Sequence, residues 1–158
     1  MPFRTHDPTH ECSCNQSQID KYLGKISGPL LNRIDIQIEV SPVKYDDLKN
    51  TRDEESSKTV KARIVKARKI QQERYSNLSI ITNSELSGKQ ISKFCNINKE
   101  SEGLLKEAFE RLGLSARAYN KILKVARTIA DLEESENIET IHIAEAIQYR
   151  SLDRKYWR

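Results

Sequence analysis

The sequence predicts a mainly α-helical fold, in which a bundle of about four helices follows a single segment of β-strand. Two observations favour this fold class. From residue 58 onward, apolar residues recur at spacings of three and four, which is the period of a helix with one buried face. In residues 34–40, by contrast, Ile and Val alternate strictly with Asp, Gln and Glu, as in a half-buried strand. We find no internal repeat.

The composition is that of one ordinary domain, or of a small domain with an appendage, since the chain has 158 residues. Hydrophobic residues make up 37% and charged residues 32%, so the chain is polar for a globular protein but unlike a disordered one. The net charge of +4 permits contact with nucleic acid or nucleotide without requiring it. No apolar run approaches the length that spans a bilayer, and three cysteines are too few for a disulfide framework. We therefore expect a cytoplasmic protein with no membrane contact.

The first 48 residues are expected to hold an irregular tail (1–16) and then short elements (17–48). Residues 17–26 have one apolar helical face, with Ser17 as the expected N-cap. The sequence SGP at 27–29 ends that helix, and Pro29 suits the first turn of another short one. The strand over 34–40 follows.

The remaining residues (49–158) are expected to form the helical domain. The helices are expected over residues 58–75, 84–95, 99–113, 116–134 and 140–151. Gly88 is the expected weak point of the second of these, and Gly113 the C-terminal stop of the third. Ser115 and Thr140 are the expected N-caps of the last two.

A lone strand leaves backbone donors and acceptors unpaired along both edges. Residues 34–40 must therefore pair with a strand that this chain does not contain, or with another copy of the chain. The alternative is a hairpin with residues 78–82, LSIIT.

Two long stretches carry a family resemblance: CSCNQSQIDKYLGKISGPLLNRIDIQIEV and LSARAYNKILKVARTIADLEESENIETIHIAEAIQYRSLDRKYW. Over about residues 11–157 the chain resembles the C-terminal region of magnesium-chelatase-like AAA+ ATPases of the ComM type, which are linked to DNA processing during natural transformation. The resemblance implies the last strand of an AAA+ core (within 17–48) and its helical lid (49–158). It also implies oligomeric rings. Because the chain has no G-x-x-x-x-G-K-[ST] motif, ATP and Mg would bind only with the missing P-loop half, and the chain alone would be inactive.

Arg33, at the start of the expected strand, is the candidate catalytic residue. By resemblance it stands where related proteins carry the arginine finger, which reaches the γ-phosphate bound to a neighbouring subunit. The residue type suits the role, because a guanidinium is always charged and its planar fork matches phosphate oxygens. The alternative is a structural ion pair with Asp35 or Glu39.

Arg117 is the candidate nucleotide-binding residue, at the place where the family carries the sensor-2 arginine of the lid. Its position in the first turn of a helix puts it beside free N–H groups, and together these favour phosphate. The alternative is a surface arginine paired with a carboxylate of a neighbouring helix. We expect Arg127 and Arg150 to form structural salt bridges.

The N-terminal tail holds four residues of the types that bind zinc, His6, His10, Cys12 and Cys14. Their spacing is not a common zinc signature, so incidental ligands in a tail are the simpler interpretation and no metal site is assigned. In the resembled family a further cysteine pair usually precedes the pair at Cys12 and Cys14, and the two pairs together could form a four-cysteine site. The first pair is absent here, so it stays open whether the tail is half of a zinc site. Cys95 is expected to be a small buried hydrophobic residue.

The expected helix 58–75 is strongly basic. Its seven cations are Lys58, Lys61, Arg63, Lys66, Arg68, Lys69 and Arg74. They support an alternative function, an independent helical module that binds DNA phosphates through this helix. Charge-rich helices are more often solvated faces, and no aromatic residue interleaves to stack on bases before Tyr75.

Overall fold

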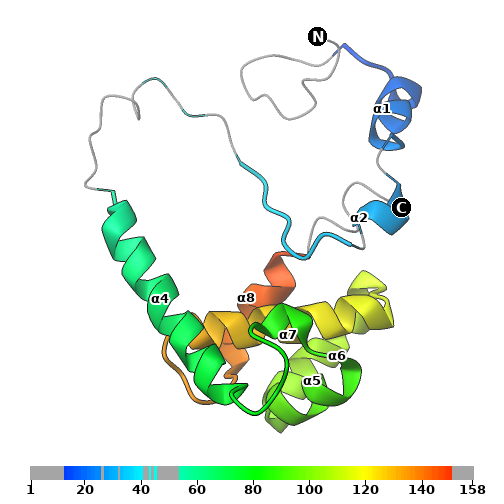
Figure 1. Cartoon of the computed structure of the whole chain (residues 1–158). Coiled ribbons are helices and arrows are strands. Elements are labelled where there is room, and N and C mark those ends of the chain that lie inside the picture. Colours follow the sequence, from blue (N-terminus) through cyan, green and yellow to red (C-terminus); the bar gives the residue numbers. More distant parts are fainter. Residues whose placement is uncertain are drawn as a thin grey trace.

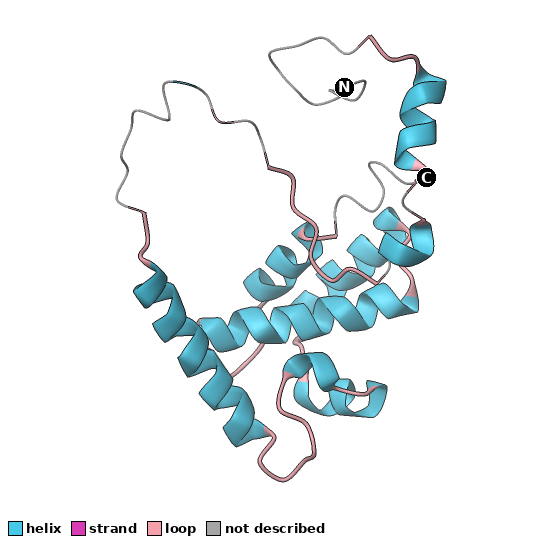
Figure 2. Cartoon of the chain, turned by 45° about the horizontal axis from the view of Figure 1, so that its top comes forward, coloured by secondary structure: helices cyan, strands magenta, loops and turns pink. Residues whose placement is uncertain are grey.

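The computed structural model describes residues 13–25, 27–31, 33–40, 43, 45 and 54–150. This part of the chain is mainly helical, as the sequence predicted (Figure 2). Its elements are α1 (Gln16–Leu23), α2 (Gly28–Leu31), α4 (Ser57–Arg74), the short 3-10 helix η1 (Asn83–Glu85), α5 (Gly88–Phe94), α6 (Lys99–Leu112), α7 (Ala116–Leu132) and α8 (Thr140–Gln148). We refer to α4–α8 with η1 as the helical body. Among the described residues, none of these helices combines the length and apolar character needed to cross a membrane.

Helix α7 is the centre of the helical body. Helices α4, α5 and α8 and the turn η1 all contact it, and α6 packs on α8 (Figure 1). Three alanines on α7 are buried, and such small side chains let neighbouring helices approach closely: Ala118, Ala126 and Ala130. The space between the helices is filled by larger apolar side chains such as Ile122 of α7, Leu105 of α6 and Ile143 of α8. Each such large side chain, fully buried, contributes about 1.5–3 kcal/mol to folding.

Two of the expected helix ends are confirmed. The Ser115 hydroxyl accepts a hydrogen bond from the Ala118 N–H at 3.2 Å and so caps α7. Gly113 ends α6 in the left-handed conformation, with φ of 62°. These positions were predictable because a cap is a local matter between residues a few positions apart.

Three other expected helix ends are corrected. Helix α1 is capped by Asn15, one residue before the helix, and not by Ser17. Gly88 does not weaken a longer helix, since it is the first residue of α5. Thr140 is the first residue of α8 and not its cap. The N-cap is Glu139, and its backbone N–H donates to Nδ1 of His142 at 2.9 Å.

Helix α4 turns one face to α7, on which Ile64, Ala67, Gln71 and Tyr75 recur at spacings of three and four. Ala67, Gln71 and Tyr75 are buried, but Ile64 on the same face is 47% exposed, so only the second half of α4 is covered. The Tyr75 ring meets that of Phe94 edge to face, with centroids 5.2 Å apart, which fastens the end of α4 to α5.

A buried polar network joins α4, η1 and α7 around Asp131, which is fully buried. Arg74 donates two hydrogen bonds to its carboxylate, at 2.5 and 3.0 Å. Arg127 adds one at 3.1 Å and Asn83 another at 2.8 Å. Burial lowers the pKa of Arg127, with Asp131 opposing the change; for Arg74 the effect of Asp131 outweighs burial and the pKa is raised. The expected structural salt bridge of Arg127 is thereby confirmed.

Residues 33–40, which we call the extended segment, are not part of a sheet in the described structure. Among the described residues, β-type pairing is limited to one parallel bridge, which joins Ile97 to Ile138 and lies outside the extended segment. The alternative hairpin between 34–40 and 78–82 is therefore not formed. The extended segment instead crosses the end of α8 (Figure 1), where the Gln37 N–H donates to the Tyr149 carbonyl at 3.0 Å. Along it, Ile36, Ile38 and Val40 are 52%, 66% and 79% exposed. Their exposure agrees with the expectation of a strand whose partners lie outside this chain.

Candidate functional site

Arg33 lies at the start of the extended segment, directly after α2. Its backbone N–H donates to the Leu30 carbonyl at 2.9 Å, and the residue is exposed. Within the described residues no ion pair joins its guanidinium to Asp35 or to Glu39, and Asp35 is paired with Lys121. The structural alternative for Arg33 is therefore not formed, and the guanidinium is available to an anion from outside.

Arg117 lies in the first turn of α7 and is also exposed. The described carboxylates of neighbouring helices form no ion pair with it, so the surface-pair alternative is not formed here either. Its helix N-terminus carries N–H groups without intrahelical partners, which favour negative charge nearby. The guanidinium of Arg117 and the free N–H groups at this helix end therefore both favour a bound anion.

Lys121 brings the backbone of Arg33 to the helix that carries Arg117. It stands four residues after Arg117 and thus on the same face of α7. Its ammonium donates to the Arg33 carbonyl at 2.6 Å and pairs with the Asp35 carboxylate. The two candidate arginines are thereby joined through one turn of α7. Sequence reasoning missed Lys121, because nothing in the helical pattern links it to residues 88 positions earlier.

Arg150, just after α8, supplies a second attachment. It is 1% exposed, and its Nη1 donates to the Ile34 carbonyl. The sequence predicted a structural salt bridge for Arg150. The role is structural, but the contact seen is to a backbone carbonyl of the extended segment.

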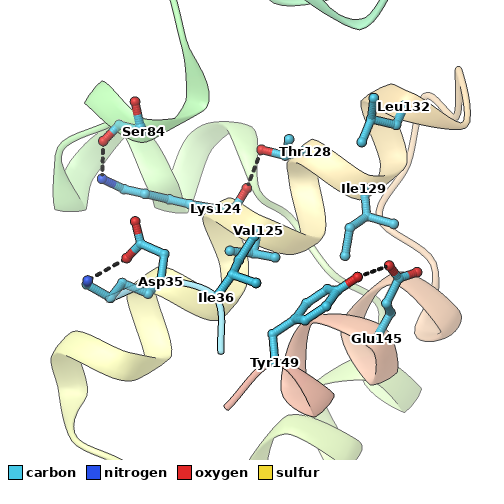
Figure 3. A pocket seen from close by; sticks show the side chains of 11 residues that line it. Asp35, Ile36, Ser84, Lys124, Val125, Thr128, Ile129, Leu132, Glu145 and Tyr149 are labelled. Carbon is cyan, nitrogen blue, oxygen red and sulfur yellow. Dashed lines mark hydrogen bonds and ion pairs between the residues drawn. The ribbon is translucent and has the colours of Figure 1, made fainter. Parts of the chain in front are cut away.

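A cavity of about 430 Å³ lies between the extended segment, α7 and the end of α8 (Figure 3). Ile36 enters it close to Val125 and Tyr149. Its polar groups are engaged with one another: Lys124 donates to the Ser84 carbonyl at 2.7 Å, and the Tyr149 hydroxyl donates to Glu145 at 2.9 Å, which raises the pKa of Tyr149. The cavity is mainly apolar, and the two lysines that line it are already bonded to other groups. It is therefore not suited to binding a phosphate.

The basic face of α4 is partly neutralised. Four of its seven cations have carboxylate partners within the described residues: Arg63 with Glu55, Lys66 with Glu134, Lys69 with Glu73, and Arg74 with Asp131. These pairs lower the positive charge that a nucleic acid would meet. DNA binding by α4 remains a prediction.

The candidate ligands of the N-terminal tail fall mostly outside the described residues. His6, His10 and Cys12 lie there, and Cys14 is partly exposed. The described part of the chain brings no three His, Cys, Asp or Glu side chains together as a metal would require. Cys95 is buried as predicted, and burial raises the pKa of its thiol to about 11.

Comparison with known proteins decides the family. Residues 54–150 match the family described as magnesium chelatase, subunit ChlI C-terminal, and residues 3–48 match the family described as magnesium chelatase, subunit ChlI. The chain belongs to the magnesium chelatase ChlI family. The resemblance seen in the sequence is thereby confirmed.

The curated relatives are much longer than this chain. Competence protein ComM of Haemophilus influenzae is 42% identical over 154 residues, which are 97% of this chain and 29% of the relative. Proteins called YifB, uncharacterised, from Salmonella typhimurium and Escherichia coli are 38% and 39% identical over 143 residues, which are 89% of this chain and 27% of each relative. The chain thus spans less than a third of the length of these relatives.

Proposed function

We propose that this chain is the C-terminal part of an AAA+ ATPase of the ChlI family, in which the helical body is the lid over a nucleotide. ATP and Mg would be held by a P-loop half outside these residues, and subunits would assemble in a ring. Arg33 would act as arginine finger on the nucleotide of a neighbouring subunit and Arg117 as sensor on phosphate. The supporting observation is that both guanidinium groups are exposed and free of ion pairs within the described residues, while Lys121 joins their backbones.

The proposed role of Arg33 in phosphoryl transfer follows from the permanent positive charge of its guanidinium. As the γ-phosphoryl group is transferred, negative charge spreads over its oxygens, and a guanidinium aimed at them stabilises the transition state more than the ground state. Such a finger raises the rate by about 10³–10⁵ where it has been measured. Arg117 would hold phosphate in the ground state as well, with help from the N–H groups of the first turn of α7.

The substrate of the motor is proposed from the relatives. The Haemophilus influenzae relative is named a competence protein, which supports DNA processing during transformation as the role of the whole protein. No hydrolysis is expected from the 158 residues alone, since the phosphate-binding loop and the magnesium ligands would come from the other half.

The test uses the longer protein that contains the P-loop half. Arg33→Ala should lower kcat by about 10³ while nucleotide affinity stays the same, because a finger acts in the transition state. Arg117→Ala should weaken nucleotide binding as well as kcat. Arg63→Ala removes another exposed arginine, on α4, and is the control. An unchanged kcat in Arg33→Ala, with Arg63→Ala also unchanged, would contradict the proposal.

A further inference from the structure

The extended segment is attached to α7 and to the end of α8 by hydrogen bonds and one ion pair, all within residues 33–37. Lys121 of α7 binds the Arg33 carbonyl at 2.6 Å and the Asp35 carboxylate. Arg150 binds the Ile34 carbonyl, and the Gln37 N–H binds the Tyr149 carbonyl at 3.0 Å. The carbonyls of two successive residues, 33 and 34, are thus each held by a cation, one from within α7 and one from just after α8.

The two cations of these attachments are mostly withdrawn from solvent, although the groups that they hold are exposed. Arg150 is 1% exposed, and the Lys121 side chain is 17% exposed, against 55% for the Asp35 side chain. Hydrogen bonds from such charged donors are strong, because burial has removed much of the donor's hydration. A shift of the backbone at Arg33 relative to α7 would break the bond from Lys121 and is therefore opposed.

We propose that Lys121 and Arg150 are positioning residues that hold Arg33 in the direction set by the helical body. The inference rests on the proposed function of Arg33 as a finger. Because Lys121 stands one turn from Arg117 on α7, the two arginines move together with the helical body. When the helical body moves over the nucleotide of its own subunit, Arg33 therefore moves with it and changes its position at the nucleotide of the neighbouring subunit.

The test pairs Lys121→Met with Lys124→Met in the longer protein with its P-loop half. Both lysines lie on α7 and both donate to a distant backbone carbonyl, but Lys124 holds Ser84 and not the extended segment. Lys121→Met should lower kcat by about 10²-fold with KM within about twofold, since a small misplacement of a catalytic group has that effect. Lys124→Met should stay near wild type, and Lys121→Arg, which keeps a charged donor, should restore most of kcat.

A double substitution separates positioning from general damage. In an Arg33→Ala background, Lys121→Met should have no further effect on kcat, because the group that it positions is gone. If Lys121→Met behaves like Lys124→Met while Arg33→Ala loses activity, the positioning role is wrong and the finger stands. If Arg33→Ala keeps its activity, both proposals are overturned.

Amide hydrogen exchange of the 158-residue chain tests the attachment itself without any activity. The Gln37 N–H should be protected in the wild type and exchange faster in Lys121→Met, whereas Lys124→Met should leave it unchanged. The amides of α7 should keep their protection in both variants, which shows that the helical body is still folded. A Gln37 amide that exchanges in the wild type as fast as in an unstructured peptide would overturn the proposal.

Discussion

At the scale of single residues, the stability of the helical body depends most on Asp131. It is the fully buried anion between two arginines from different helices, Arg74 and Arg127. Arg127 also donates to the carbonyls of Ser135 and Glu136, at 2.6 and 2.8 Å, so the network ties the chain after α7 back to the helix. Both arginines of the network, Arg74 and Arg127, are paired with the carboxylate of Asp131.

We therefore predict that Asp131→Ala destabilises the chain by about 3–5 kcal/mol, because it leaves two arginines poorly compensated in a buried place. Chemical denaturation of the 158-residue chain measures this. Glu134→Ala is the matched control, since Glu134 pairs only with the exposed Lys66 in the described structure. It should change stability little. Equal effects of the two substitutions would show that burial of the network contributes nothing.

The residue scale also shows what sequence reasoning can reach. The pairing of Arg127 with Asp131 is local, four residues along one helix, and a structural role for Arg127 was predictable from its place among apolar residues. The bond from Lys121 to Arg33 was not predictable, because it joins residues far apart in the sequence whose own surroundings look ordinary. Periodicity shows which face of a helix is buried but not which segment covers it.

At the scale of elements, two glycines, one inside α6 and one directly after it, have opposite roles. Gly113 ends the helix with φ of 62°, a conformation that costs a residue with a Cβ. Gly103 lies inside the helix, and a Cβ added there would meet no atom within 4 Å. In the helix interior a glycine costs conformational entropy and gains nothing in return.

The two alanine substitutions should therefore have opposite signs. Gly113→Ala should destabilise by about 1 kcal/mol, through left-handed strain. Gly103→Ala should stabilise by about 0.5–1 kcal/mol. Thermal or chemical unfolding of both variants measures the difference. If Gly113→Ala does not destabilise, the left-handed end of α6 is contradicted; if Gly103→Ala destabilises, the open space at Gly103 is contradicted.

Helix α4 shows that periodicity can give the correct face of a helix without giving how much of it is buried. Ile64 and Gln71 lie on the same face, yet the apolar Ile64 is exposed and the polar Gln71 is buried. The covered part is set by what α4 meets, namely α7, whose Asp131 binds Arg74 at the end of α4. Periodicity does not show how much of a helix a neighbour covers.

At the scale of the whole molecule, the described chain comprises the short helices α1 and α2, the extended segment and the helical body. The helical body has its own core, whereas the outer part of the extended segment keeps its apolar side chains exposed. Alternation of residue types correctly predicted an extended conformation there, but a sheet needs partner strands, which the described residues do not provide. Arg33 lies where the extended segment is attached to the helical body.

The most direct test of the account is a subunit-mixing experiment with the longer protein that contains the P-loop half. Wild-type subunits are mixed with rising proportions of Arg33→Ala subunits, and ATP hydrolysis is measured per wild-type site, with nucleotide binding and assembly checked in parallel. The account predicts a steep loss, because each wild-type site needs the Arg33 of its neighbour. A loss merely in proportion to the variant, or none, with assembly intact, would contradict the role of Arg33 across the interface.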